Sequence, residues 1–109
     1  MLDNPEKTLD LIAEMRFAVP FEVELTPPLL ARLRSEAGGG EIEPRGIVRE
    51  VSYAGDEGGI LLHIDSERPQ RRLVASLTHV AVRRTQPFGA AALAYQKHRI
   101  KKLKRQSQF

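Results

Sequence analysis

Apolar and polar residues alternate near the start of the chain with the period of a strand. Phe21, Val23 and Leu25 are separated by two glutamates. A period of two is typical of a strand that buries one face. We therefore expect a short strand at 21–25.

A capping side chain followed by proline marks the expected start of two helices. Asn4 precedes Pro5, and Thr26 precedes Pro27. Asn and Thr side chains accept hydrogen bonds from free amides of the first turn, and proline at the first helical position lacks an amide that would have no partner there. The expected helices cover 5–15 and 27–37.

Three strand-like runs follow at close spacing. They cover 46–53, 59–65 and 73–77, with Val80 and Val82 as an extension of the third run. The first connection, 54–58, is rich in glycine and acidic residues, and the second is polar and contains Pro69. Both compositions favour turns between antiparallel strands, so residues 43–83 are expected to form a β-meander.

The last element is an amphipathic helix that becomes strongly basic. Leu93, Ile100 and Leu103 lie at helical spacing after Pro87, which predicts a helix over 86–106. Six of the nine residues 97–105 are Lys or Arg. We expect the helix to begin against the core and to end in solvent.

Four or five short strands are too few for a β-sandwich, whereas a small closed barrel leaves no sheet edge exposed. We predict a single α+β domain over 1–109. Residues 1–40 would be a helical N-terminal extension with one short strand, followed by a small antiparallel β-barrel or meander of four to five strands and the basic C-terminal helix.

Two stretches of the chain resemble known proteins. Residues 45–48 (Arg-Gly-Ile-Val) and 74–80 (Val-Ala-Ser-Leu-Thr-His-Val) resemble SH3-like small barrels, in which a turn after the fourth strand leads into a short last strand; the likeness covers about 40 residues. Residues 76–79 and 94–99 (Ala-Tyr-Gln-Lys-His-Arg) are similar to small uncharacterised proteins of cyanobacteria. The first resemblance implies an SH3-like barrel, and the second implies no activity.

Composition places the chain among ordinary globular proteins. It has 109 residues, of which 41% are apolar and 28% charged, enough for one core. No apolar stretch approaches the roughly 18 residues of a membrane-spanning helix, and the N-terminus is acidic where an export signal would be basic and then apolar, so we expect a cytoplasmic protein with no membrane insertion. The absence of cysteine excludes disulfides and thiolate chemistry.

Charge is divided unevenly along the chain. All 14 acidic residues lie at or before Glu67, together with six basic residues, whereas the residues after Glu67 contain 11 Lys or Arg and no acid. This division favours an anionic partner for the second part of the chain, or pairing of the two parts within one fold or between subunits.

The candidate binding residues are the cations of the second part. They are Arg83, Arg84, Lys97, Arg99, Lys101, Lys102, Lys104 and Arg105. A cationic helix can neutralise phosphates and so bind nucleic acid with little sequence selectivity. It can also dock on an acidic protein surface, mediate self-association, or only increase solubility.

Few aromatic residues are present for base stacking, on which sequence-selective RNA binding by small barrels depends. We expect Tyr53 to have a core role and three phenylalanines to fill the core as well: Phe17, Phe21 and Phe88. Because the acidic part of the chain would repel a polyanion, a protein partner is favoured over nucleic acid.

Catalytic and metal-binding patterns are missing. The three histidines, His63, His79 and His98, do not share a metal-ligand spacing. The acidic residues of the 54–58 turn are accounted for by turn composition. The chain contains no nucleophile motif, and its core is too small for a ligand pocket of roughly 300 Å³ or more. We expect no enzyme, no cofactor and no small-molecule substrate.

These observations predict a non-catalytic adaptor or interaction protein that docks on an acidic protein partner or assembly. The alternative is a weakly specific RNA- or DNA-binding protein that uses the same basic helix.

Overall fold

The computed structural model describes residues 3–36, 38, 42–67 and 70–106. These residues form an α+β fold. Its elements in chain order are α1 (Pro5–Ala18), β1 (Phe21–Leu25), α2 (Pro27–Glu36), β2 (Arg45–Tyr53), α3 (Gly55–Gly58), β3 (Ile60–Glu67), β4 (Gln70–Ser76), the 3₁₀ turn η1 (Leu77–His79), β5 (Val80–Val82) and α4 (Gly89–Gln106).

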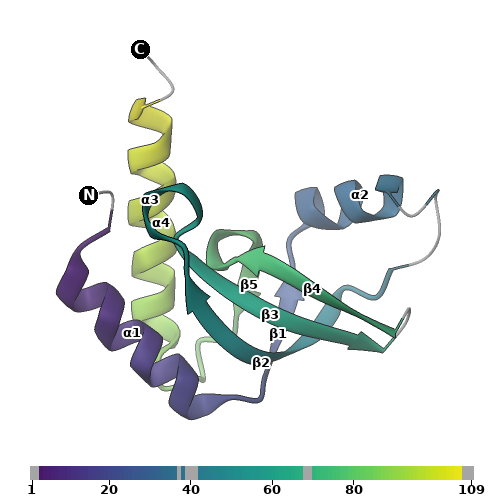
Figure 1. The fold of residues 1–109 in the computed structure, drawn as a ribbon, viewed down its shortest axis with the longest axis horizontal. Helices are drawn as coiled ribbons and strands as arrows, with labels where there is room; N and C mark the ends of the chain where they lie inside the picture. The colour runs from purple at the N-terminus through teal and green to yellow at the C-terminus, as the bar shows by residue number, and fades with distance from the viewer. Residues whose placement is uncertain (1–2, 37, 39–41, 68–69, 107–109) are drawn as a thin grey trace.

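The five strands form one open antiparallel sheet in the order β4-β3-β2-β1-β5 (Figure 1). β2, β3 and β4 form the expected meander, whereas β1 pairs with β2 on one side and with β5 on the other. Within the described residues β4 and β5 are the two edges and do not pair. The prediction of a closed barrel is therefore not confirmed.

The third strand-like run and its extension at Val80 and Val82 form two strands, β4 and β5, with η1 as a turn between them. The Ser76 hydroxyl accepts a hydrogen bond from the Thr78 amide at 3.2 Å and caps η1. After this turn Val80 lies opposite Leu25 in the sheet. A local side-chain cap thus ends β4, and the chain after it forms β5 at the opposite edge of the sheet, next to β1.

Alternation along the strands places the core. Phe21, Val23 and Leu25 are buried, as their spacing predicts. In β2 the register shifts between Val48 and Glu50, so that both Val48 and Val51 face the core although they are three residues apart. The centroids of the Phe21 and Phe88 rings lie 4.8 Å apart within this core.

α1 and α4 lie side by side, and α2 lies away from them at the other side of the view (Figure 1). The Asn4 side chain accepts from the Lys7 amide at 3.0 Å, which confirms the predicted cap. α1 continues to Ala18, three residues beyond the predicted end. None of the helices in the described ranges is both long and apolar enough to cross a membrane.

The prediction that Phe17 fills the core is wrong, because its side chain is 95% exposed. α1 buries Thr8, Leu11, Ile12 and Met15. Phe17 follows Met15 by two residues, a rotation of about 200° around the helix, and therefore faces solvent.

Candidate functional site

α4 positions the predicted binding residues, and its first half is anchored in the core. Phe88, Ala92, Tyr95 and Arg99 are all buried, and their spacing places them on one face of the helix. The Gln96 side-chain amide donates to the main-chain oxygens of Leu77 and Val80 at 2.7 and 2.8 Å. α4 is therefore held against η1 and β5 by polar as well as apolar contacts.

Arg99 does not belong to the exposed cations. Its side chain is 2% exposed and faces the fully buried carboxylate of Asp3. Nη1 of Arg99 donates to Oδ1 and Oδ2 of Asp3 at 3.2 and 3.1 Å, and Nη2 donates to the Asp56 main-chain oxygen at 2.6 Å. A buried arginine with a buried acidic partner is a structural anchor, so Arg99 is not available to an outside partner.

Two tyrosines complete this buried cluster, which we name the Asp3 network (Asp3, Tyr53, Tyr95 and Arg99). The hydroxyls of Tyr53 and Tyr95 donate to Oδ2 of Asp3 at 2.8 and 3.1 Å, and the Ile60 amide donates to the Tyr95 hydroxyl at 3.0 Å. The network ties Asp3, two residues before α1, to the end of β2, the start of β3 and the middle of α4. Tyr53 itself is 36% exposed, so the prediction that it has a core role is wrong, although its hydroxyl bonds the buried Asp3.

Burial gives both tyrosines unusual acid–base properties. Burial, together with the hydrogen bond to Asp3, raises the pKa of Tyr53 to about 12. Burial also raises the pKa of Tyr95 to about 12, although the hydrogen bond from the Ile60 amide acts in the opposite direction. Both hydroxyls therefore keep their protons and donate to Asp3 at neutral pH.

The second half of α4 carries the exposed cations. Lys97, Lys101, Lys104 and Arg105 are exposed, and Lys102 is half-buried. We name Lys97, Lys101 and Arg105 the cationic stripe, because their spacing of four residues places them along one ridge of the helix. Within the described part of the chain the structure records no ion pair for these three residues.

Arg83 and Arg84, the other two candidate residues, lie before α4 and away from the stripe. α4 has 18 residues and is therefore about 27 Å long. Arg83 lies 3.3 Å from Glu22 on β1, and Arg84 is exposed in the segment that leads into the helix. The predicted residues thus divide among the cationic stripe with its neighbours, the buried anchor Arg99, and this distant pair.

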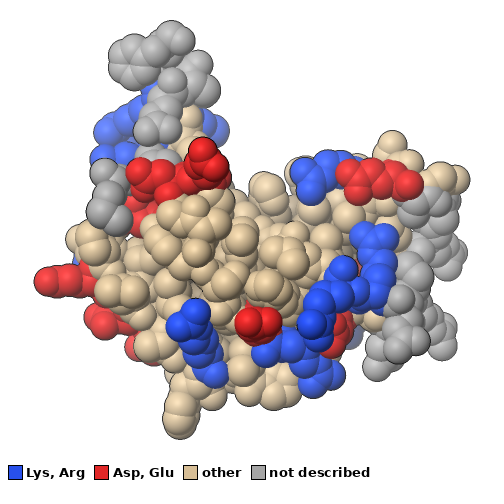
Figure 2. Space-filling view, in the orientation of Figure 1, with Lys and Arg blue, Asp and Glu red and all other residues tan. Residues whose placement is uncertain are grey.

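Basic residues of the sheet are balanced by acidic ones. Asp65 lies 3.3 Å from Arg49 and 3.1 Å from Arg72, and Glu22 lies 3.8 Å from Arg45. Blue and red side chains accordingly adjoin each other over the sheet (Figure 2). The acidic and basic parts of the chain therefore do pair within one molecule, but among the described residues no such ion pair involves the cationic stripe.

Apolar side chains flank the exposed cations. Ile100 and Leu103 on α4 are 41% and 39% exposed, and Val74 on β4 is 49% exposed. Leu103 and Val74 line an open hollow of about 260 Å³, together with Leu61 and Ala75. The end of α4 thus presents apolar as well as cationic groups to solvent.

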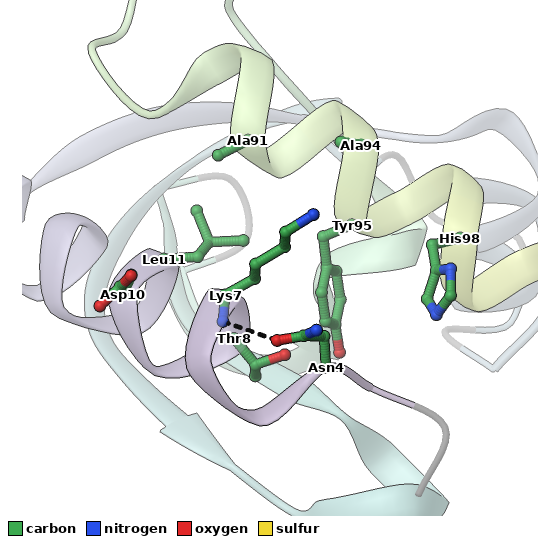
Figure 3. A pocket seen from close by; sticks show the side chains of 9 residues that line it. All are labelled: Asn4, Lys7, Thr8, Asp10, Leu11, Ala91, Ala94, Tyr95 and His98. Atoms are coloured by element: carbon green, nitrogen blue, oxygen red, sulfur yellow. Dashed lines mark hydrogen bonds between the residues drawn. The ribbon is translucent and has the colours of Figure 1, made fainter.

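A larger groove runs between α1 and α4, although the size of the core predicted no such pocket. It measures about 490 Å³, and its lining includes Leu11 from α1 and Ala91, Ala94 and Tyr95 from α4. The Lys7 side chain extends across it toward α4 (Figure 3). The groove is open, and its lining also includes polar and titratable side chains: Asn4, Lys7, Thr8, Asp10 and His98.

The histidines lie apart from one another. His63 is within 2.9 Å of the Ser52 hydroxyl and 3.9 Å from Glu50 on the sheet, His79 is exposed in η1, and His98 lines the α1–α4 groove. No group of three His, Asp or Glu residues suited to a metal ion occurs within the described ranges.

The Asp3 network has no signal in the sequence. Asp3 and Arg99 are 96 residues apart, and each lies in a polar segment where a charged residue is expected at the surface. Only the helical phase of α4 could have suggested burial, because Arg99 continues the apolar spacing of Ala92 and Tyr95.

Comparison with known proteins gives no relative. No protein-family model, no curated protein and no solved structure matches the chain. What the protein does must therefore be argued from the geometry of its own residues.

Proposed function

We propose that this protein is a non-catalytic interaction module whose α4 end docks on an acidic, partly apolar surface of a protein partner. The observation that carries the proposal is the exposed cationic stripe, which has no acidic partner in the described structure and lies beside Ile100, on the same helix end as Leu103.

The apolar neighbours favour a protein partner over nucleic acid. Protein interfaces combine an apolar centre with polar and charged groups around it. Partly exposed Ile100 supplies apolar area next to the stripe, and partly exposed Leu103 lies farther around the same helix end. Binding to a nucleic-acid backbone needs the cations alone. No exposed aromatic group on α4 is available for base stacking, since Tyr95 is buried.

The anchored half of α4 supports the proposal as well. Burial of Arg99 against Asp3 and the two hydrogen bonds from Gln96 hold the helix in one position. A binding surface that is already ordered loses less conformational entropy when the partner binds. The stripe is therefore presented on a rigid support.

The likeness to SH3-like small barrels remains part of this proposal. The 3₁₀ turn η1 between β4 and the short β5 agrees with the feature on which the resemblance rests, and the pairing of β5 with β1 is compatible with a strongly bent, incompletely closed barrel.

Binding to defined probes tests the proposal. One probe is a labelled amphipathic peptide with glutamates on one helical face and leucines on the other; the others are a generic single-stranded RNA and a generic duplex DNA. We expect fluorescence anisotropy to show binding of the peptide. Reversal of the stripe (Lys97→Glu, Lys101→Glu, Arg105→Glu) should weaken this binding at least about tenfold, and Ile100→Ser with Leu103→Ser should weaken it too.

The matched control reverses three arginines outside α4: Arg34→Glu, Arg71→Glu and Arg84→Glu. It changes the net charge by the same amount and should leave peptide binding nearly unchanged. Peptide binding that survives reversal of the stripe would contradict the proposed site. The nucleic-acid alternative would replace the proposal if the protein binds RNA or DNA tightly, if this affinity falls steeply as the salt concentration rises, and if the Ile100→Ser and Leu103→Ser substitutions leave it unchanged.

A further inference from the structure

The solvent-facing side of α1 carries a ridge of exposed apolar side chains. Leu9, Ala13 and Phe17 are all exposed, Leu9 to 65% and Phe17 to 95%. Their spacing of four residues aligns them along the helix. A phenylalanine this exposed, in line with a leucine, is typical of a surface that another protein covers.

An acidic stripe runs along this ridge. Glu6, Asp10 and Glu14 have the same spacing of four residues, are exposed, and have no ion pair within the described residues. Acidic side chains gather at the left edge of the molecule, where α1 lies (Figure 2). On its other side the stripe adjoins the α1–α4 groove, because Asp10 lines that groove with Leu11.

The acidic stripe of α1 and the cationic stripe of α4 are complementary in spacing and in sign. Each has three charges separated by four residues, which is about 6 Å per step along a helix. Each stripe is accompanied by exposed apolar side chains, namely the ridge on α1 and Ile100 on α4. Because each stripe carries a single sign of charge, the match holds for parallel and for antiparallel helices.

We infer that the acidic partner of the cationic stripe is a second copy of this chain, bound through the apolar ridge and the acidic stripe of its α1. This inference deepens the proposed function and rests on it. The two surfaces belong to neighbouring helices of one molecule (Figure 1), so that a two-fold axis can place each α1 against the other copy's α4. The same contact then forms twice, and the two copies make a closed dimer.

Charge reversal with mixing tests the inference. One variant reverses α1 (Glu6→Lys, Asp10→Lys, Glu14→Lys), and the other reverses α4 (Lys97→Glu, Lys101→Glu, Arg105→Glu). In sedimentation velocity over about a hundredfold range of concentration, the wild-type protein should approach the mass of a dimer as concentration rises. Each variant alone should remain a monomer, because like charges then face each other, whereas an equal mixture of the two should form a mixed dimer.

Phe17 provides a test that leaves the charges unchanged. Phe17→Ser should raise the dissociation constant of the dimer at least about tenfold, because the largest and most exposed apolar side chain of the ridge is lost from the contact. Thr85→Ser, an exposed position before α4, is the matched control and should leave the constant unchanged. Circular dichroism of all variants establishes that they are folded.

Four outcomes would overturn the inference: a wild-type protein that stays monomeric, a dimer that survives both reversals, a mixture that does not associate, or a series of ever larger oligomers in place of a dimer. Wild-type protein that remains a monomer but binds the acidic peptide through the stripe would refute self-association and leave the proposed function standing. If the peptide does not bind while the reversals and their mixture behave as expected, docking on an outside acidic partner is refuted and the dimer stands.

Discussion

Arg99 shows how position on a helix decides the role of a side chain. It lies two residues from Lys97 and from Lys101, yet it is buried against Asp3 while both lysines are exposed. Two residues correspond to a rotation of about 200°, which turns the guanidinium from solvent to the core. A charge buried in this way is tolerated only with a partner, because an uncompensated buried charge is strongly unfavourable.

Removing one partner of this pair should therefore destabilise the protein. We expect Arg99→Met or Asp3→Asn to lower the free energy of unfolding by about 3–5 kcal/mol. Urea denaturation followed by circular dichroism measures this change. The control Lys101→Met, in the same helix but exposed, should change it by no more than about 0.5 kcal/mol. Equal effects of Arg99→Met and Lys101→Met would contradict the anchoring role.

The tyrosines of the Asp3 network predict a loss of stability at alkaline pH. The folded-state pKa values of Tyr53 and Tyr95 are raised to about 12 from the ordinary value of 10.0. Between these two values the unfolded chain releases tyrosine protons and the folded chain keeps them, so stability should fall as pH rises from about 10 to about 12, and it should be fully present below 10.

Urea midpoints measured at a series of pH values check this expectation. The double variant Tyr53→Phe, Tyr95→Phe is less stable at every pH because it loses hydrogen bonds, but its stability should decline less steeply between pH 10 and 12. Identical slopes in the variant and the wild-type protein would show that other groups cause the alkaline loss.

At the scale of elements, the short helix α3 joins β2 to β3 at a point where the chain passes close to α4. Gly59 ends α3 with a φ of +65°, and a Cβ at this position would overlap the Tyr95 hydroxyl and the Arg99 guanidinium. The turn that joins β2 and β3 is thus fitted to the Asp3 network. Close approach of this backbone requires glycine both for its conformation and for space.

A pair of glycine substitutions separates these two requirements. Gly55 has a similar φ of +68°, but a Cβ there would meet nothing within 4 Å. Gly55→Ala should therefore cost only the backbone strain, about 1–2 kcal/mol. Gly59→Ala should cost about 1–3 kcal/mol more, since Tyr95 and Arg99 must also shift. Urea denaturation of the two variants compares them, and equal losses would show that the close approach is not important.

At the scale of the whole molecule, positive charge is concentrated at one place. Residues 97–105 hold six of the 17 Lys and Arg residues and no acid, so the rest of the chain has 11 basic and 14 acidic residues. The body is therefore net negative, while the α4 end is strongly positive. Such a molecule favours oriented association with an acidic partner at low salt, and screening by salt should weaken it.

Stability should also vary across the molecule. The central strands β2 and β3 bury Val48, Val51, Ile60, Leu62 and Ile64, whereas α2 is held by the apolar contacts of three leucines: Leu29, Leu30 and Leu33. We expect amide hydrogens in β2 and β3 to exchange only through global unfolding and those of α2 to exchange faster, through local opening. Native-state hydrogen exchange measures both, and equal protection would contradict a separately opening α2.

Local elements were predictable from the sequence because their signals are local. The period of two at Phe21–Leu25, the helix starts after Asn4 and Thr26 and the helical spacing after Pro87 all correspond to observed elements. The strand order was not predictable in the same way. β5 is three residues long, and its pairing with β1 depends on the η1 turn and on the hydrogen bonds from Gln96, which only the folded chain brings together.

The same distinction holds for the candidate site. The sequence by itself determined that 97–105 is helical and cationic, because composition and spacing are properties of one segment. Only the tertiary structure decided that Arg99 is a buried anchor, that Phe17 is exposed and that the cationic stripe has no ion pair with any described residue. These outcomes depend on Asp3, Tyr53 and Tyr95 meeting from distant parts of the chain, and packing between distant segments determines which face of each helix remains in solvent.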